Sequence, residues 1–296
     1  MKTTASKGPQ RLDRPSQTES FEVELDQDHP GLSDLVYRRR RDEIARQARA
    51  HVPGMPAAHV AYTEEEEATW RAVWRHLRPE LEATALSAVL ESMQAWAPWE
   101  RGIPQLYELS AGPDRQGRSR VAHLPGPLFG TGIRFEPVDG LLSSRDFFAS
   151  LKEGIFRSTQ YLRHGSRPHY TPEPDLVHEI VGHASTFSID GVAELSRAFG
   201  DAAATADDEA LLRLERLYWF TLEFGLVEEG GQPKAFGAGL LSSAGELAAV
   251  AEADLRAFSC EAIEAQAYDT GHMQPVFFVA QSLDELLGQT LERVNG

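Results

Sequence analysis

The sequence has one cysteine, Cys260, among 296 residues, and no apolar run of about 18 residues. A single cysteine excludes an internal disulfide framework and is typical of a reducing compartment. The missing apolar run excludes a helix that spans a membrane. The polar start, MKTTASKGPQ, lacks the hydrophobic segment of a secretory signal. We therefore expect a cytoplasmic protein.

Basic residues are also scarce, with 29 Lys and Arg against 45 Asp and Glu and a formal net charge of −16. This balance excludes a nucleic-acid-binding protein, because phosphate contacts require clustered positive charge. The 42% of hydrophobic residues can form a sizeable core. Residues 1–20 hold few apolar side chains, so we expect a disordered N-terminal segment, followed by a single domain over residues 21–296.

Most of the chain shows the apolar spacing of helices. The expected helices are residues 34–50, 64–77, 80–96, 143–164, 192–200 and 209–226, with a last one ending near Val294. Short strands are expected within 135–142 and 276–280, and a hairpin or loop at 228–239. Proline and glycine make residues 110–132 a long exposed loop. The predicted fold class is mainly α with small β elements.

Residues 171–183, TPEPDLVHEIVGH, are the most informative stretch. Pro174, with acidic residues on both sides, predicts the start of a helix that carries His178 and His183. Their spacing is i, i+5, which leaves about 140° between the two side chains on a regular helix. Metal binding by both imidazoles therefore requires the helix to end or bulge near Gly182. On spacing alone, one core histidine and one surface histidine is the favoured interpretation.

Glu223 is the candidate third ligand, because no other charge lies between Leu217 and Val227. Burying a lone carboxylate costs several kcal/mol, so such a group is normally paired or bound to a metal. A partner arginine is the alternative. Two histidines and one carboxylate leave coordination positions open, which is the arrangement of non-heme Fe(II) oxygenases.

Six stretches, in the same order along the chain, resemble the pterin-dependent aromatic amino acid hydroxylases. They are ELDQDHPG, GLLSSRDF, STQYLRHGSRPHYTPEPDLVHEIVGH, LYWFTLEFGL, KAFGAGLLSSAGEL and MQPVFFVA. The resemblance covers about residues 22–285, the whole catalytic domain of that family. It implies an aromatic amino acid hydroxylase-like catalytic domain that uses Fe(II), a tetrahydropterin such as tetrahydrobiopterin, O2 and an aromatic amino acid. The sequence shows no counterpart of the family's regulatory domain or tetramerisation helix. In this it resembles the short bacterial members, and that resemblance implies a monomer.

The resemblance assigns roles to individual residues. His178, His183 and Glu223 are expected to bind iron. The expected pterin pocket consists of Phe147, which stacks on the pterin, and of Val138, Leu142, Ser144, Tyr218 and Glu179. The expected substrate pocket consists of Arg163 on the substrate carboxylate, Asp175 beside it, and Thr171, Trp219, Ser242 and Ser243. The chemistry agrees, since an arginine fork suits a carboxylate and a flat ring suits a flat heterocycle.

The choice of substrate depends on two positions. Trp219 matches phenylalanine and tyrosine hydroxylases, whereas tryptophan hydroxylases usually carry phenylalanine there. Thr270 falls where tyrosine hydroxylases carry an acid, which favours phenylalanine as the substrate, although the neighbouring Asp269 weakens the argument. A further departure, Arg157, stands where animal members carry a histidine near the pterin.

The sharpest departure follows the second iron ligand. Most members read Gly-His-Val-Pro, but this chain continues from His183 with Ala184, Ser185 and Thr186. Losing the proline is expected to free the backbone, and the smaller Ala184 to widen the pocket. These three residues and Thr270 are the candidates that set ring position. Para attack, giving tyrosine, is the first choice and meta attack, giving 3-hydroxyphenylalanine, is the alternative; tryptophan or tyrosine hydroxylation is less favoured. A zinc hydrolase and a non-catalytic binding protein are the remaining alternatives.

Overall fold

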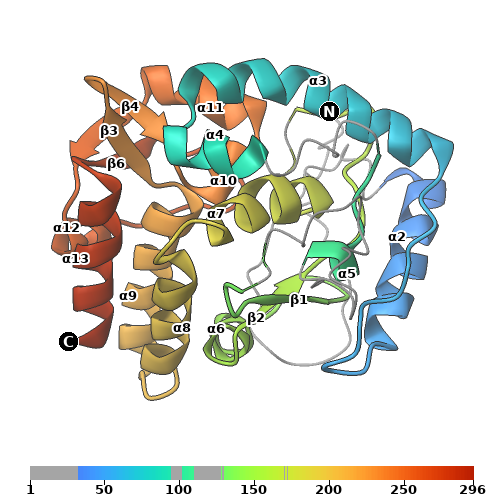
Figure 1. The fold of residues 1–296 in the computed structure, drawn as a ribbon, viewed down its shortest axis with the longest axis horizontal. Coiled ribbons are helices and arrows are strands. Elements are labelled where there is room, and N and C mark those ends of the chain that lie inside the picture. Colours follow the sequence, from blue (N-terminus) through green and yellow to red (C-terminus); the bar gives the residue numbers. More distant parts are fainter. Residues whose placement is uncertain (1–32, 95–101, 110–127, 129, 170, 172) are drawn as a thin grey trace, which may run out of the picture.

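The computed structural model describes residues 33–94, 102–109, 128, 130–169, 171 and 173–296 (Figure 1). The expected disordered segment 1–20 and most of the 110–132 loop lie outside these residues. Helices wrap around two small sheets, which confirms the prediction of a mainly α protein with small β elements. None of the helices in the described part of the chain is both long and apolar enough to cross a membrane.

Three helices form the N-terminal part: α2 (Leu35–Arg49), α3 (Glu64–Thr84) and α4 (Ser87–Gln94). Helix α3 begins with a capping box, in which the Thr63 hydroxyl and the Glu66 carboxylate each bind the other residue's backbone N–H. The prediction that a new helix starts near residue 80 is wrong, because α3 runs through Pro79. Buried Leu77 and Leu81 continue its apolar face past the proline.

A short parallel sheet pairs β1 (Arg134–Pro137) with β2 (Ile155–Ser158). Helix α6 (Ser144–Lys152) connects them and starts at an N-cap hydrogen bond to the Ser143 hydroxyl. The predicted helix 143–164 is therefore correct only in its first half. It stops because Gly154 adopts a positive φ of 67° and the next four residues pair with β1. The short helix α5 (Leu106–Leu109) packs against this sheet.

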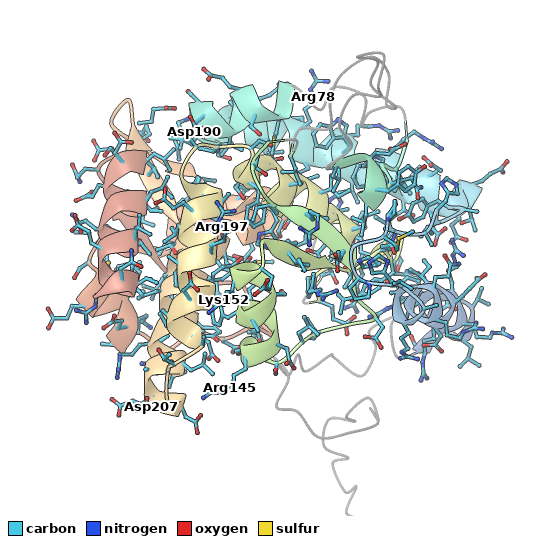
Figure 2. All side chains as sticks on the ribbon, turned by 60° about the horizontal axis from the view of Figure 1, so that its bottom comes forward. Arg78, Arg145, Lys152, Asp190, Arg197 and Asp207 are labelled. Atoms are coloured by element: carbon cyan, nitrogen blue, oxygen red, sulfur yellow. The ribbon has the colours of Figure 1, made fainter. Side chains whose placement is uncertain are left out.

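The middle of the chain is helical from Leu176 to Phe187, and again in α8 (Val192–Ala203) and α9 (Asp208–Tyr218). Helix α8 lies along α6, and the Gly200 backbone approaches α6 closely. Figure 2 shows Arg145 and Lys152 projecting outward from α6. Their ion pairs with Asp208 and Asp201 join α6 to α9 and α8 across the surface.

The second sheet has the strand order β4-β3-β6-β5. Strands β3 (Leu226–Glu229) and β4 (Gln232–Ala235) form the expected hairpin, and β6 (Val276–Ala280) runs parallel to both β3 and β5 (Asp254–Ala257). Short helices lie between these strands, and α13 (Leu283–Asn295) ends the chain. These short helices are α10 (Ala238–Leu241), α11 (Ala244–Ala249), the 3₁₀ turn η4 (Val250–Glu252) and α12 (Cys260–Ala265).

One hydrophobic cluster contains most of the buried side chains and surrounds the central helix at residues 176–187. Gly182 lies within this helix and is not among the glycines with a positive φ, so the helix does not end there. A Cβ atom at Gly182 would lie 2.6 Å from the Ala238 carbonyl oxygen. Glycine therefore permits the contact between the central helix and α10.

This contact generates a stability prediction. Gly182→Ala should lower the free energy of unfolding by about 1–3 kcal/mol, because the added methyl group overpacks a backbone-to-backbone contact. Gly288→Ala is the matched control: a Cβ at this α13 position meets no atom within 4 Å. That variant should gain about 0.5–1 kcal/mol from its better helix propensity. Urea denaturation measures both, and a neutral Gly182→Ala contradicts the packing account.

Candidate functional site

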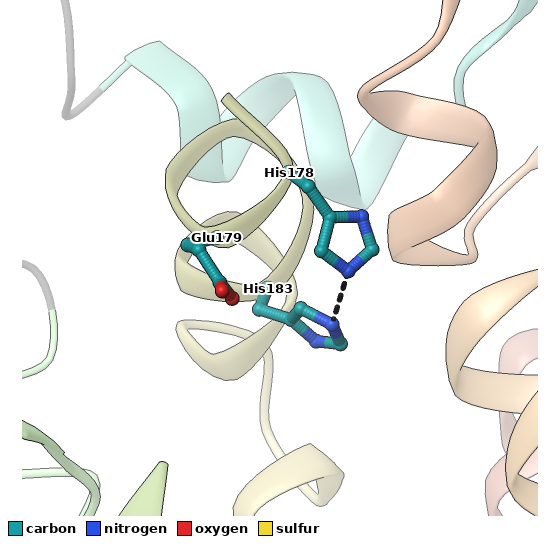
Figure 3. Close-up of side chains that lie close together, drawn as sticks. All are labelled: His178, Glu179 and His183. Atoms are coloured by element: carbon teal, nitrogen blue, oxygen red, sulfur yellow. Dashed lines mark hydrogen bonds between the residues drawn. The ribbon is translucent and has the colours of Figure 1, made fainter. Parts of the chain in front are cut away.

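His178 and His183 project from the same side of the central helix toward one another (Figure 3). Their Nε2 atoms are 3.0 Å apart, and their rings meet edge-on with centroids 4.7 Å apart. The segment that carries them, η2 (His178–Ala184), is a π-helix. Its hydrogen bonds join residues five apart, which brings positions i and i+5 close together. The predicted bulge is thus confirmed, and the helix continues past it into α7 (Ser185–Phe187).

Glu223 approaches the two imidazoles from a second π-helix, η3 (Trp219–Glu223), which extends α9. Its Oε1 atom lies 3.0 Å from Nε2 of His183, and its Oε2 atom lies 3.5 Å from Nε2 of His178. The Glu223 side chain is 12% exposed. Among the residues that the structure describes, the ion-pair partners of this largely buried carboxylate are imidazoles and not an arginine.

A second carboxylate, that of Glu179, lies beside His183 on the same helix (Figure 3). Its Oε1 atom accepts hydrogen bonds from the backbone N–H and the hydroxyl of Thr159, both at 3.0 Å. Glu223 instead directs one oxygen at each imidazole. Glu223 is therefore the better third donor, and Glu179 is a neighbour held by its own hydrogen bonds.

Burial and charge set the protonation of these groups. Burial lowers the pKa of His178 to about 4, which leaves a neutral imidazole at neutral pH. Burial alone would raise the pKa of Glu223, but the nearby imidazoles reverse that effect and lower it. Burial raises the pKa of Glu179 to about 7. A neutral imidazole at His178 and an ionised Glu223 are the protonation states in which these groups bind a divalent cation, so this donor set fits a metal.

A hydrogen bond to Ser242 orients the His178 ring. The Ser242 hydroxyl donates to the Gly239 carbonyl at 3.2 Å and lies 3.1 Å from His178 Nδ1. Because the hydroxyl proton is already used, Nδ1 must carry the proton of the imidazole and donate it to Ser242. The Nε2 lone pair then faces Glu223 and His183, as metal ligation requires.

The three donors open into one cavity. Most residues that the sequence assigned to the site line it together, namely His178, His183, Glu223, Val138, Leu142, Phe147, Tyr218, Glu179, Arg163, Thr171, Trp219, Ser242, Ser243 and Thr270. Five others are absent from the described lining, namely Ser144, Asp175, Ala184, Ser185 and Thr186. Ser144 is the first residue of α6 and follows the residue that caps that helix.

Asp175 lies behind Arg163 and holds it. Arg163 donates from Nε to Oδ2 at 2.9 Å and from Nη2 to Oδ1 at 2.8 Å, and its backbone N–H also donates to Oδ2. Both side chains are buried. Asp175 also accepts from the His178 N–H at 3.2 Å, so it caps the helix, which begins at Leu176. The prediction that Pro174 occupies the first turn is therefore wrong by two residues.

Aromatic rings form much of the cavity wall. Phe147 lies edge-on to Tyr218 and Phe156, with centroids 5.3 and 5.9 Å away. Trp219 packs against Phe224 and Tyr268, with centroids 4.7 and 4.5 Å away. Burial raises the pKa of Tyr218 well above its usual value, so this phenol stays neutral. The cavity therefore offers flat apolar surfaces beside charged groups.

The residues after His183 do not behave as the sequence suggested. Ala184, Ser185 and Thr186 are fully or almost fully buried in the core, away from the lining described above. The backbone is not freed either, because the Ser185 N–H donates to the Gly182 carbonyl, which a proline could not do. The Thr186 hydroxyl donates to the His183 carbonyl at 3.0 Å. The contacts of Ser185 and Thr186 with the backbone at Gly182 and His183 therefore connect these residues to the site through the position of His183.

Several polar residues that line the cavity were not assigned to the site from the sequence, among them Thr159, Glu246 and Gln274. Glu246 stands among small and apolar residues in SSAGELAAV, and this isolation, the same signal that identified Glu223, could have found it. Burial raises its pKa to about 7. Gln274 and Thr159 are uncharged and lie within the stretches that resemble the family, but no isolated charge marks either as part of the site.

Comparison with known proteins agrees with this site. Residues 9–293 match the family model described as biopterin-dependent aromatic amino acid hydroxylase. Rat tyrosine 3-monooxygenase is 42% identical over 271 residues, covering 90% of this chain and 52% of the relative. Rat phenylalanine-4-hydroxylase is 41% identical over 283 residues, covering 93% and 59%. The chain thus spans a little over half the length of these relatives.

Solved structures show the same fold. Phenylalanine hydroxylase from Chromobacterium violaceum, with bound iron(III) and 7,8-dihydrobiopterin, superposes with a TM-score of 0.73 at 24% identity, over 88% of this chain and 90% of that one. The cold-active phenylalanine hydroxylase from Colwellia psychrerythraea superposes with a TM-score of 0.71 at 26% identity, over 82% and 90%. On the family match and the shared catalytic fold, the chain belongs to the biopterin-dependent aromatic amino acid hydroxylases.

Proposed function

We propose that this protein is a tetrahydropterin- and Fe(II)-dependent monooxygenase that hydroxylates the ring of L-phenylalanine to give tyrosine. One observation carries the proposal. The imidazoles of His178 and His183 face the Glu223 carboxylate in a single cavity, and the buried Arg163 lines the same cavity. Iron and tetrahydropterin, when bound, supply the activation of O2 that places one oxygen atom on the ring. The protein binds and orients the reactants and excludes water from them.

In this proposal His178, His183 and Glu223 hold the iron, and their open sides leave coordination positions free for reactants. Ser242 holds the tautomer of His178 that exposes the Nε2 lone pair. A hydrolytic zinc site is disfavoured, because the i, i+5 pair on a π-helix differs from the i, i+4 arrangement of zinc proteases. Glu223 is desolvated and pairs with two imidazoles, an arrangement that a protein without catalytic function does not need. A non-catalytic binding protein is therefore also disfavoured.

The pterin subsite lies around Phe147, whose ring is held edge-on by Tyr218 and Phe156. Val138 and Leu142 supply further apolar lining, and Glu179 supplies a hydrogen-bonding carboxylate. Arg157, also in the lining, is paired with buried Glu136 at 3.0 Å, so its charge is already compensated. A flat heterocycle can stack on Phe147 while its polar edge faces Glu179.

The amino acid subsite is built on Arg163. Its ion pair with Asp175 holds the guanidinium group in place before any ligand arrives, and Ser242 and Ser243 lie beside it in the lining. Asp175 occupies the Nε and Nη2 fork, and the Pro168 and Ser242 carbonyls accept from two further N–H groups. The guanidinium therefore offers a substrate carboxylate its positive charge and its remaining Nη1 hydrogen. Trp219 and Phe224 then offer apolar surface to the aromatic ring.

Phenylalanine is favoured over tyrosine because Thr270, and not an acid, faces the cavity at the position that distinguishes the two hydroxylases. The neighbouring Asp269 does not replace it. The Asp269 carboxylate accepts from the Gly271 N–H at 2.8 Å and lies 2.9 Å from His272 Nδ1, so its oxygens are used within its own turn. The tyrosine and phenylalanine hydroxylases are about equally similar to this chain, so the substrate needs a direct test.

That test is turnover with iron, tetrahydrobiopterin, O2 and each aromatic amino acid. We expect phenylalanine to have the highest kcat/KM, with para-tyrosine as the main product separated by chromatography from authentic meta-tyrosine. Reactions without pterin or without iron are the controls and should give no product. A higher kcat/KM for tryptophan or tyrosine contradicts the choice of substrate.

Meta attack is the second candidate, and one observation supports it. The bond from the Ser185 N–H to the Gly182 carbonyl cannot form in members that carry proline at this position, so the backbone at His183 is constrained differently here. A shift of about an ångström between metal and ring is enough to change which ring carbon reacts. Meta-tyrosine as the main product would establish this alternative.

The metal ligands generate the next prediction. Glu223→Gln should weaken Fe(II) binding by about 100-fold or more, because it removes an anionic donor. Glu179→Gln is the matched control and should keep affinity within about tenfold, since Thr159 occupies that carboxylate. Anaerobic calorimetry on metal-free protein measures both. The reverse order of effects would make Glu179 the third ligand.

The pterin subsite is tested with Phe147→Leu, which keeps apolar volume but removes the flat ring. The KM for tetrahydropterin should rise about 3- to 10-fold, the range of a lost aromatic stack, while the KM for phenylalanine stays within about twofold. Phe278→Leu, a core change outside the cavity lining, is the control for lost stability. An increase confined to the phenylalanine KM would place Phe147 in the amino acid subsite.

The amino acid subsite is tested with Arg163→Lys, which keeps the charge and loses the two-pronged bond to Asp175 that holds the cation in place. The kcat/KM for phenylalanine should fall about tenfold or more, while that for phenethylamine, which has no carboxylate, should scarcely change. Arg157→Lys is the matched control, since Arg157 also lines the cavity and also pairs with a buried carboxylate. Equal losses for both compounds would remove Arg163 from the carboxylate subsite.

We also propose that the chain works as a monomer with one catalytic domain over residues 21–296. The support for the monomer is the resemblance to short bacterial members of the family. The main hydrophobic cluster, moreover, extends from Ala57 to Val294.

A further inference from the structure

Gln274 is a buried glutamine in the cavity wall to which the reaction proposed above assigns no role. Its exposed fraction is 3%, and it lies between the turn at residues 269–272 and strand β6. Burying a primary amide is costly unless its hydrogen bonds are satisfied. The partners of this amide therefore indicate what the residue holds in place.

The Gln274 side chain joins two separate parts of the wall. Its Nε2 donates to the Asp269 carbonyl at 2.7 Å and to the His272 carbonyl at 2.8 Å, and its Oε1 accepts from Trp219 Nε1 at 3.1 Å. Carbonyl groups only accept and an indole N–H only donates, so the amide has a single orientation that satisfies all three. The Gln274 backbone N–H donates to Glu246 Oε2 at 3.2 Å, which anchors the residue to α11.

One of the two parts is the Trp219 indole. Its packing against Tyr268 and Phe224 restrains the tilt of the ring plane. The hydrogen bond to Gln274 restrains rotation within that plane, because it holds one edge of the ring. Trp219 is also the first residue of the π-helix that ends at Glu223. The ring and the third donor are therefore four residues apart on one rigid segment.

The other part is the turn that brings Thr270 to the cavity. The amide of Gln274 holds a carbonyl at each end of this turn, and the Asp269 side chain closes it through Gly271 and His272. The Gln274 side chain therefore fixes the position of Thr270 as well as that of Trp219. The two wall groups are 51 residues apart in the sequence, yet they share one support.

We propose that Gln274 is a positioning residue that aligns Trp219 and the 269–272 turn, and so determines which ring carbon of the substrate is hydroxylated. The inference rests on the proposed function, since it concerns the same cavity and substrate. Productive geometry is held to a fraction of an ångström by supporting hydrogen bonds of this kind. Loss of the support lets the substrate ring tilt, which changes the attacked carbon and wastes reduced pterin.

Glutamine meets all three requirements at this position, and the residues nearest to it in shape do not. Glutamate would place a carboxylate oxygen where the Nε2 donor stands, so that this oxygen would repel the carbonyl oxygens of Asp269 and His272. Leucine would leave the two carbonyls and the indole N–H without partners. Asparagine is one methylene group shorter and cannot span the same gap from the same backbone position.

The test compares Gln274→Leu with Gln105→Leu. Gln105 is likewise buried and its amide exchanges two hydrogen bonds with Val60, but it lies outside the cavity lining. In Gln274→Leu, hydroxylated product per tetrahydropterin oxidised should fall about threefold or more, and the ratio of meta- to para-tyrosine should change by at least as much. The KM for tetrahydropterin should stay within about twofold. Gln105→Leu should lose stability while both product measures stay at wild-type values.

Two further measurements separate positioning from general damage. Trp219→Phe removes the indole donor, so adding Gln274→Leu to that variant should change the product ratio much less than it does alone. Gln274→Glu keeps the acceptor for the indole and loses the two donors, and it should give an intermediate product ratio. It also serves if Gln274→Leu fails to fold. An undiminished effect in the Trp219→Phe background contradicts the inference.

The indole N–H signal of Trp219 in a ¹H–¹⁵N spectrum, assigned with Trp219→Phe, needs no turnover. It should move in Gln274→Leu and stay unchanged in Gln105→Leu. If wild-type protein does not hydroxylate phenylalanine, the proposed function fails, and this signal still decides whether Gln274 holds Trp219. If wild-type protein is active but Gln274→Leu keeps the wild-type coupling and product ratio, the inference is overturned.

Discussion

The site depends on i→i+5 hydrogen bonding in two separate helices. A regular helix would direct His178 and His183 to different faces, and the π-helical turn brings their Nε2 atoms to 3.0 Å. The segment that ends at Glu223 uses the same device. π-Helical turns are rare and poorly stabilised by themselves, so tertiary contacts must hold them. Two such contacts are the close approach of Gly182 to Ala238 and the cap that Asp175 forms at the start of the central helix.

Desolvation is the second constraint. Three carboxylates that lie in or directly behind the cavity wall are each compensated in their own way. Asp175 faces the guanidinium of Arg163, Glu223 faces two imidazoles, and Glu179 accepts two hydrogen bonds from Thr159. These three groups therefore already have their partners before a ligand binds. A preorganised site of this kind can orient an amino acid and a cofactor without rearranging, which is what positioning catalysis requires.

Much of this arrangement could be predicted from the sequence. Glu223 was identified by its isolation among apolar residues, and the need for a helical bulge followed from the i, i+5 spacing. Other features could not be predicted from local patterns. Helix α3 passes through Pro79 because buried leucines hold it, and the helix expected at 143–164 gives way to a strand at Gly154. Such outcomes are decided by tertiary packing, which outweighs local propensity. Gln274 escaped notice for a related reason, since its partners are distant backbone carbonyls and one indole.

The central claim is that His178, His183 and Glu223 together form one iron site. Anomalous diffraction from crystals grown anaerobically with Fe(II), with data collected on both sides of the iron absorption edge, tests it most directly. We expect one strong iron peak within about 2.0–2.2 Å of both Nε2 atoms and of a Glu223 oxygen, the range of metal–nitrogen and metal–oxygen bonds in such sites. A peak bonded to Glu179 in place of Glu223, or a peak elsewhere in the molecule, would contradict the account.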